Sequence, residues 1–299
     1  MKIAAAAYPI EWQNRWNEYV GKIRVWVRTA AENGAELLVF PEFAAMEVAS
    51  LAREENAKDL QKSIDAVSAR QKDVDELHSS LAREFKVHIC AGSGPVRRED
   101  RSAVNRTRLF APDGSSGSQD KLIPARFERE SWGISPGGAP KVFETALGRI
   151  GILIGYDCEF PLIARSMAEA GAEVLLVTGC APTMQGYWRV RVSAMARALE
   201  NQCVVVHSTT VGEADWLAAA PKNMGTAAIY GPPDTGFPED GIISTGKMNG
   251  PGWVYGEVSL DAVRHVREAG TVRNFSHWPE QDDRLAQAES VSLVAEPVA

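Results

Sequence analysis

Apolar side chains recur with a helical period in two parts of the first third of the chain. Between residues 16 and 31 they fall every three to four positions, and Asn33 and Gly34 follow as residues that commonly end a helix. A similar period predicts a second long helix over residues 59–85. Each of these segments is expected to bury one face against the rest of the protein.

Short apolar runs between the helical segments predict buried strands. Residues 36–40 form one such run, which ends before Pro41, and residues 87–92 form another. Two hairpins are expected where turn-forming residues separate extended segments, one at residues 112–114 and one at Gly148. The chain therefore alternates between predicted helices and predicted strands.

One internal similarity bears on the fold class. Residues 30–42 and residues 167–180 share a helix end, a Gly-Ala-Glu turn and an apolar strand. Repeated units of this kind predict an α/β fold in which helices cover a sheet, with an approximate internal two-fold; a chance similarity is the alternative. Because no Pro-, Gly- or Ser-rich linker interrupts them, residues 1–281 are expected to form one domain, and residues 282–299 a tail without a strong pattern.

Composition and charge exclude several classes of function. The 299 residues are 45% hydrophobic and 24% charged, with a net charge of -7 and no basic stripe, so a nucleic acid partner is not expected. The N-terminal residues resemble a first strand rather than a secretory signal, and no run approaches the roughly 18 apolar residues of a membrane span. A soluble, cytoplasmic protein without a membrane partner is expected.

The four cysteines are far apart, and none stands in a CxxC motif or beside a histidine at zinc-ligand spacing. Neither a metal site nor a disulfide framework is therefore expected. Cys90 and Cys203 lie in apolar, strand-like runs and are expected to be small core residues. The five histidines lack the motif of a Cys-His enzyme, and GxSxG, Walker and GxGxxG patterns are absent.

Three residues with reactive side chains each follow a predicted strand: Glu42, Lys121 and Cys158. Because ligands collect at the carboxyl ends of strands in α/β sheets, these three side chains are expected to converge on one pocket. Taken singly, a glutamate after a proline or a lysine in a hairpin is more often a solvated charge.

Cys158 has the most unusual surroundings, because Asp157 and Glu159 flank it and Pro161 fits the first turn of a helix. Free amides at a helix start favour a thiolate and can stabilise an oxyanion, whereas neighbouring carboxylates disfavour the thiolate. A nearby lysine would compensate the acidic surroundings, and a glutamate could take the thiol proton. The pattern predicts a nucleophilic site.

The chain resembles the nitrilase superfamily of carbon-nitrogen hydrolases in three ordered segments. These are LLVFPE at residues 37–42, DKLIP at residues 120–124 and IGILIGYDCEFP at residues 150–161. Downstream segments agree, and the resemblance covers about residues 2–262. It implies an α-β-β-α sandwich of two mixed sheets covered by helices, which dimerises into a longer multilayer sandwich, so a homodimer or higher homo-oligomer is expected.

The resemblance also implies roles for the site residues. It makes Cys158 the nucleophile, Glu42 the general base and Lys121 the ammonium that stabilises the oxyanion. A second catalytic glutamate is expected shortly after the lysine, where both Glu128 and Glu130 stand, and the local sequence favours Glu128. No metal or organic cofactor is implied.

The implied reaction is hydrolysis of a non-peptide carbon-nitrogen bond in a small amide or N-carbamoyl compound, through a thioester that releases ammonia or an amine. Glu159 and Phe160 follow the cysteine where true nitrilases typically have tryptophan, which favours amides over nitriles. A nitrilase, or a catalytically silent binding protein of the same fold, is the alternative.

Substrate contacts are less defined by the sequence. The backbone amide of Glu159 is expected at the oxyanion, and segments that would line the pocket mouth contain Arg126, Glu130, Trp132, Tyr187 and Trp188. An arginine there could pair with a substrate carboxylate. A surface arginine and packing aromatics are the alternative, and the identity of the substrate stays open.

Overall fold

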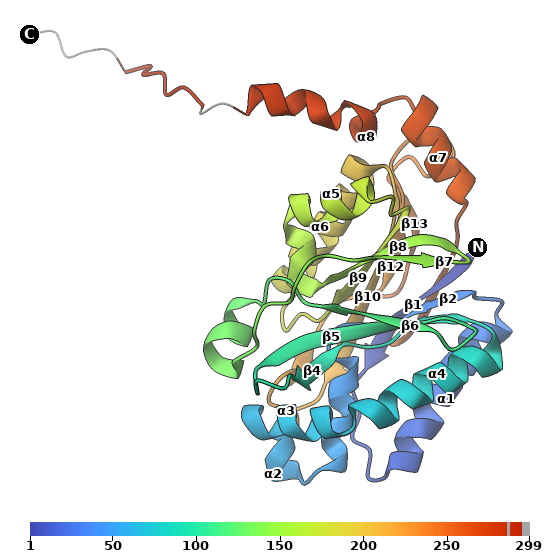
Figure 1. Ribbon diagram of the computed structural model, residues 1–299, viewed down its shortest axis with the longest axis vertical. Coiled ribbons are helices and arrows are strands. Elements are labelled where there is room, and N and C mark those ends of the chain that lie inside the picture. The colour runs from blue at the N-terminus through green and yellow to red at the C-terminus, as the bar shows by residue number, and fades with distance from the viewer. Residues whose placement is uncertain (286–287, 295–299) are drawn as a thin grey trace, which may run out of the picture.

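A curled sheet with helices on both sides forms the centre of the protein (Figure 1). The computed structural model describes residues 1–285 and 288–294. The strands are β1 (Lys2–Pro9), β2 (Leu37–Val39), β3 (His88–Cys90), β4 (Gly94–Arg97), β5 (Ala103–Phe110), β6 (Ser116–Asp120), β7 (Val142–Thr145), β8 (Gly148–Ile154), β9 (Val174–Gly179), β10 (Val204–Glu213), β11 (Lys222–Asn223), β12 (Ala228–Tyr230), β13 (Ile242–Thr245) and β14 (Gly252–Glu257).

The α-helices are α1 (Trp16–Glu32), α2 (Glu54–Ala57), α3 (Leu60–Ala69), α4 (Gln71–Phe85), α5 (Pro161–Glu169), α6 (Met184–Asn201), α7 (Leu260–Ala269) and α8 (Asn274–His277). Shorter helical turns of other types are η1 (Ala44–Leu51), η2 (Glu128–Trp132), η3 (Gly155–Glu159) and η4 (Trp278–Arg284). α1 confirms the first predicted helix. The prediction of one helix over residues 59–85 was wrong, because α3 and α4 meet at Arg70. α3 packs on β4 and η1, whereas α4 packs on α1 and β5. The apolar side chains keep a helical period through both helices, although each helix packs against different elements.

Six parallel strands run through the middle of the sheet, in the order β3-β2-β1-β10-β9-β8. Their side chains are largely buried on both faces, as is typical of parallel strands covered by helices. The two predicted hairpins are confirmed as the antiparallel pairs β5–β6 and β7–β8. Gly148 turns the second hairpin with a φ of 101°, a conformation that favours glycine.

The sheet curls until strands that are far apart along it face each other. β1, β10 and β9 separate β2 from β8 in the strand order. Adjacent strands lie about 4.8 Å apart, so a flat sheet would hold β2 and β8 about 19 Å from each other. A Cβ placed on Gly155, the residue after β8, would nevertheless lie 2.2 Å from Oε2 of Glu42, which follows β2 by two residues. Hydrogen bonds join the strands into one curled sheet, so the prediction of two separate mixed sheets is not confirmed.

Buried apolar side chains form three clusters around this sheet. One cluster lies inside the curl and joins Ile3 and Val39, on β1 and β2, to Ile152 and Leu176, on β8 and β9. A second cluster packs α1 and α4 against the other face of β1 and β2. The third packs α5 and α6 against the other face of β8, β9 and β10. Figure 1 shows these two pairs of helices on opposite sides of the sheet.

The C-terminal helices attach to α5 and α6 through two arginines. Arg165 on α5 donates to the carbonyl oxygen of Phe275 on α8 at 3.0 Å, and Arg267 on α7 donates to the carbonyl oxygen of Asn201, the last residue of α6, at 3.1 Å. Beyond this contact the chain leads away from the sheet (Figure 1). The tail predicted from residue 282 begins within η4, and part of it, residues 286–287 and 295–299, lies outside the described residues. Among the helices of residues 1–285, none combines the length and apolar character needed to cross a membrane.

Candidate active site

A buried ammonium group lies between two carboxylates at the curled end of the sheet. Nζ of Lys121 is 2.7 Å from Oε1 of Glu42 and 2.5 Å from Oε2 of Glu128. Each of the three residues is only 2% exposed. Asn105 joins the two acids, because its Nδ2 donates to Glu42 Oε1 at 3.0 Å and to Glu128 Oε1 at 3.2 Å. We call these four residues the Glu-Lys-Glu cluster.

Different elements bring the members of the cluster together. Glu42 follows β2 and stands before Phe43, whose φ of 60° turns the chain into η1. Lys121 follows β6, and its backbone amide donates to the carbonyl oxygen of Asn105 on β5 at 2.8 Å. Glu128 begins η2 and accepts a hydrogen bond from the amide of Ala125 at 2.7 Å. The residues that resembled the family's acid and lysine therefore meet although 79 residues separate them.

The environment of the cluster shifts the pKa of Glu42 toward neutral pH. Burial raises the pKa of Glu42 to about 7, the Lys121 ammonium opposes that rise, and the Glu128 carboxylate adds to it. Burial disfavours the ammonium form of Lys121, but the two carboxylates more than offset this and raise its pKa above the ordinary value. Glu42 can thus act as a general base beside a permanent positive charge.

Asp157 ties the η3 turn to the segment that carries Lys121. Its carboxylate accepts hydrogen bonds from the amides of Leu122 and Ile123 at 2.8–3.1 Å and from the amide of Ile154 at 3.2 Å. Burial raises the pKa of Asp157 to about 6, although these hydrogen bonds oppose the shift. Gly155 begins the turn with a φ of 50°, so its backbone, without a side chain, faces the Glu42 carboxylate.

Cys158 lies in the same turn, but its sulfur is placed among apolar side chains. The residue is fully buried, belongs to the cluster under α5 and α6, and has its Sγ 3.8 Å from the carbonyl oxygen of Val190. Burial raises the pKa of the thiol above its ordinary range, and Glu159 adds to the rise. Within the described part of the chain, no hydrogen bond joins this sulfur to Glu42 or Lys121. The role of Cys158 as nucleophile stays a prediction.

The structure spreads the predicted substrate contacts over several places. Arg126 and Glu130 pair with each other at 2.8 Å on the surface, so Glu128 rather than Glu130 is the glutamate beside the lysine. Trp132 is fully buried, donates from its indole nitrogen to the carbonyl oxygen of Leu60, and packs against Phe43 with the two rings tilted at 60°.

The remaining predicted contacts lie around α6. Tyr187 is buried and stacks on His207, and Trp188 is 47% exposed. Glu159 lies 3.6 Å from Arg189. In residues 1–285 and 288–294 these side chains have no hydrogen bond or ion pair with the Glu-Lys-Glu cluster, so their contact with substrate is untested.

The sequence did not indicate the roles of Asn105 and Asp157. Asn105 stands inside a strand without a neighbouring motif, and Asp157 was noted only as an acidic neighbour of the cysteine. For Asp157, the one signal in the sequence was its position after β8, at the carboxyl end of a strand.

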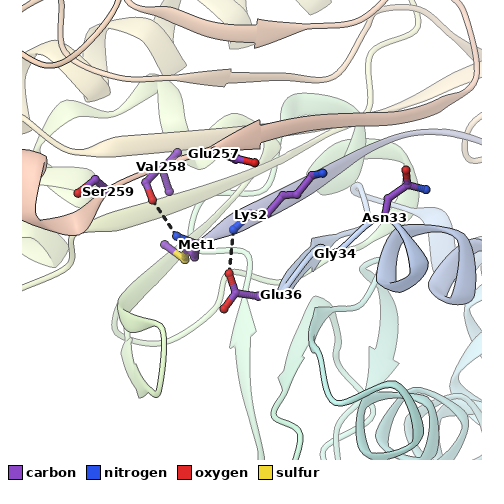
Figure 2. Close-up of a pocket in the computed structure, with 8 residues that line it drawn as sticks. All are labelled: Met1, Lys2, Asn33, Gly34, Glu36, Glu257, Val258 and Ser259. Atoms are coloured by element: carbon purple, nitrogen blue, oxygen red, sulfur yellow. Dashed lines mark hydrogen bonds between the residues drawn. The ribbon is translucent and has the colours of Figure 1, made fainter.

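An open surface hollow at the N-terminus is separate from these residues. Figure 2 shows that Met1, Lys2, Glu36 and Val258 line part of it. The N-terminal amine donates to the carbonyl oxygen of Val258 at 2.9 Å, and the Lys2 amide donates to Glu36 at 2.9 Å. These contacts hold the edge of the sheet, and none of the predicted site residues lies among the residues that line this hollow.

Comparison with known proteins identifies the family of the chain. The profile described as carbon-nitrogen hydrolase matches residues 2–264. The chain belongs to the carbon-nitrogen hydrolase family. The resemblance to the nitrilase superfamily is thereby confirmed.

Three known proteins illustrate how this chain relates to others. The chain is 33% identical over 275 residues to the probable hydrolase YhcX of Bacillus subtilis. The aligned region covers 92% of this chain and 53% of YhcX. The chain thus spans about half the length of the curated relatives it matches. The fold is shared with Nit3 of Saccharomyces cerevisiae, a member of branch 10 of the nitrilase superfamily (TM-score 0.70, 19% identity, 90% of this chain and 93% of that one). It is also shared with an amidase from Nesterenkonia sp. (TM-score 0.64, 20% identity, 88% and 92%).

Proposed function

We propose that this chain hydrolyses the carbon-nitrogen bond of a small amide or N-carbamoyl compound and releases ammonia or an amine. The observation that carries the proposal is the Lys121 ammonium held at 2.7 Å and 2.5 Å between the carboxylates of Glu42 and Glu128, all three nearly inaccessible to solvent. A fixed positive charge in a place of low dielectric is suited to an amide oxygen that becomes negative.

The proposed reaction passes through a thioester. Glu42 takes the proton of a thiol as the sulfur attacks the amide carbon, and Lys121 holds the developing oxyanion. When the carbon-nitrogen bond breaks, the proton on Glu42 passes to the leaving nitrogen. Water, deprotonated by Glu42, then attacks the thioester and releases the acid and the free thiol.

The sequence assigns the thiol of this reaction to Cys158, and the structure shows what that assignment requires. The side chain of Cys158 would have to leave the apolar cluster and its contact with Val190 before the sulfur could meet the substrate. Support for thiol chemistry in general comes from the base and the ammonium of the Glu-Lys-Glu cluster, which do not depend on that rearrangement.

Two alternatives to amide hydrolysis predict a different substrate or no reaction at all. A nitrilase would convert nitriles to acids, and some curated relatives carry that name, such as nitrilase 1 of Arabidopsis thaliana. A silent protein of the same fold would bind but not turn over. Amide hydrolysis is favoured because the glutamate and phenylalanine after Cys158 resemble the amidase branch of the family.

The experiment is a screen for ammonia release from small amides, N-carbamoyl amino acids and matched nitriles. Turnover of at least one amide or carbamoyl compound is expected, with a loss of at least about 100-fold in kcat/KM for Lys121→Met because the oxyanion loses its charge partner. Lys62→Met, which changes an exposed lysine on α3, is the matched control and should keep the rate. Turnover of nitriles alone would favour the nitrilase, and binding without any turnover would favour the silent protein.

A further inference from the structure

We propose that residue 155 is the position from which a nucleophile of this site attacks most directly, and that Gly155 therefore limits the rate of the chain as it stands. The inference rests on the proposed amide hydrolysis and names the position that controls its covalent step. Three observations carry it: the direction in which residue 155 points, the shape of the η3 turn, and the side of that turn on which the Cys158 sulfur lies.

A side chain on residue 155 would point at the base of the Glu-Lys-Glu cluster. The three atoms nearest to an added Cβ all belong to the Glu42 carboxyl group, with Oε2 at 2.2 Å, Cδ at 2.9 Å and Oε1 at 3.0 Å. This Oε1 also accepts hydrogen bonds from Lys121 Nζ at 2.7 Å and from Asn105 Nδ2 at 3.0 Å. Once the flexible end of Glu42 shifts, a thiol on residue 155 would stand beside both the base and the ammonium.

The η3 turn has a form that suits the presentation of a nucleophile. It joins the end of β8 to the start of α5, and Gly155 begins it with a φ of 50°. In α/β-hydrolases, a sharp and strained turn between a strand and a helix exposes the nucleophile at the end of the sheet. The backbone conformation does not require glycine, because Phe43, Lys86 and Gln202 carry side chains at φ values of 60°, 56° and 44°. The turn could therefore hold a side chain that the glycine lacks.

Cys158 is held on the α6 side of the same turn. Its Sγ packs among the apolar side chains under α5 and α6, 3.8 Å from the carbonyl oxygen of Val190. Its own carbonyl oxygen accepts a hydrogen bond from Arg197 at 2.9 Å, and this arginine is only 5% exposed. The sulfur can meet Glu42 only after a rearrangement of this packed region. Because catalysis depends on the positions of the reacting groups, that requirement makes the route through Cys158 slow.

The rest of the cluster keeps the groups that bind an amide. Oδ1 of Asn105 is buried and has no hydrogen bond to any described residue. Since buried polar groups are nearly always paired in native proteins, this oxygen points to a ligand with N–H groups, such as a primary amide. The Lys121 ammonium can hold the carbonyl oxygen of the same ligand. The chain as it stands is therefore expected to bind small amides better than it converts them.

A thiol beside Glu42 would complete the proposed reaction. Glu42 takes the thiol proton while the sulfur-carbon bond forms, and the carbonyl electron pair moves to the oxygen beside Lys121. The carbon-nitrogen bond then breaks, the proton passes from Glu42 to the leaving nitrogen, and water releases the acid and the thiol. A small thiol from solution can supply the same group to the unmodified chain. In that case its proton goes to the leaving nitrogen, and its sulfur leaves with the acyl group as a free thioester.

The first test adds a thiol by substitution in the full chain. Gly155→Cys is expected to raise kcat/KM for ammonia release at least about tenfold, and mass spectrometry after an acid quench should find the acyl group on residue 155. Adding Cys158→Ala to this variant should keep the gain. Gly155→Ala carries the same strain without a thiol and should show no gain. Gly212→Cys is the matched control, because Gly212 is exposed, has a φ of 88° and lies in open space; it should keep the unmodified rate.

The second test needs no cysteine variant to fold. Ammonia release by the unmodified chain is measured with increasing 2-mercaptoethanol, and a rise of at least about threefold that saturates is expected. The same thiol should not accelerate Gly155→Ala, because its methyl group occupies the place beside Glu42. Circular dichroism melting checks that each variant is folded.

The outcomes separate this inference from the proposed function. A folded Gly155→Cys chain without a gain in rate, or an acyl group on Cys158 in that variant, would overturn the role of residue 155 and leave amide hydrolysis standing. If Gly155→Cys does not fold, the absence of acceleration by 2-mercaptoethanol would overturn it. Turnover by Gly155→Cys, when the unmodified chain turns over none of the amides, would overturn the proposed function and support the role of residue 155.

Discussion

At the scale of single residues, the charge state of Glu42 depends on the neighbour across the lysine. The Lys121 ammonium favours the Glu42 carboxylate, whereas burial and Glu128 favour the protonated acid, and the balance places its pKa at about 7. A base with this pKa is half deprotonated near neutral pH and can both take and return a proton during one turnover. Glu128 therefore has two effects, since it keeps Lys121 in place and also tunes Glu42.

This balance predicts a pH dependence that Glu128 controls. Because Glu42 must be deprotonated to act as a base, kcat/KM of the wild type should fall about tenfold per pH unit below 7. In Glu128→Gln the repulsion that raises the Glu42 pKa is gone, so the acid limb should move to lower pH. The measurement is kcat/KM from pH 5 to 9, normalised for each protein. Glu130→Gln, which removes an exposed glutamate two residues away, should leave the midpoint unchanged; an equal shift in both variants would contradict the role of Glu128.

Gly155 is the residue whose missing side chain faces Glu42. In Gly155→Cys the new Cβ fits only if the Glu42 carboxylate moves aside, and the thiol then stands at the cluster. We expect alkylation by iodoacetamide at position 155 and a loss of about 1–2 kcal/mol in the free energy of unfolding, because a φ of 50° disfavours a Cβ. Gly155→Ala carries the same strain without the thiol and is the control. A folded Gly155→Cys variant that is not alkylated at position 155 would show that this position is not open to the site.

At the scale of elements, the site depends on how the η3 turn is fixed to the β6 end. The three backbone amides that converge on Asp157 come from both sides of this junction, two from the segment after Lys121 and one from the end of β8. The carboxylate thus fixes the distance between Lys121 and the turn that faces Glu42. An apolar side chain could not replace this carboxylate, because it would leave the three backbone amides without a hydrogen-bond acceptor.

Asp157→Asn tests this connection. An asparagine keeps one acceptor oxygen but turns an NH2 group toward amide donors, which leaves at least one buried N–H unpaired. The free energy of unfolding in urea should fall by about 1–3 kcal/mol. Turnover should fall as well, because Lys121 loses its fixed position. Asp73→Asn, an exposed change on α4 that removes the pair with Arg70, should stay within about 0.5 kcal/mol. A loss no larger than in this control would contradict the proposed junction.

At the scale of the whole molecule, an apolar surface on α5 and α6 suggests where two chains would meet. Leu162, Val192 and Leu199 are 71%, 59% and 39% exposed, and Trp188 on α6 is 47% exposed. Exposed apolar side chains gathered on neighbouring helices commonly mark an interface between proteins. The homodimer implied by the family resemblance stays a prediction, and this surface is the one we expect it to use.

Light scattering after size-exclusion chromatography tests the dimer. The wild type should have twice the mass of one chain at micromolar concentration, and the pair of changes Leu162→Glu and Val192→Glu should shift it to one mass, because two charges would be buried in the interface. Leu285→Glu, also at an exposed leucine but after η4, should not change the mass. A monomeric wild type would contradict the prediction, and a dimer that survives both glutamates would place the interface elsewhere.

The chain's own pattern determined its local structure and part of its site. The period over residues 16–31, the turn residues at 112–114 and Gly148, and Pro161 at the start of α5 all act within a few positions of the chain, and the structure agrees with them. The sequence also placed Glu42 and Lys121 after strands, and strand ends are where functional groups collect in α/β proteins. These features depend on near neighbours, which the sequence contains.

Only the tertiary structure decided what lies next to what. The curl that brings β2 to β8 arises from packing both halves of the sheet on one shared core, a contact between residues more than a hundred positions apart. For the same reason the sequence could not show that α3 and α4 separate at Arg70, or that Asn105 joins the two acids. The sequence predicted burial for Cys90 and Cys203 only, whereas the helices and strands around each thiol also bury Cys158 and leave Cys180 partly exposed.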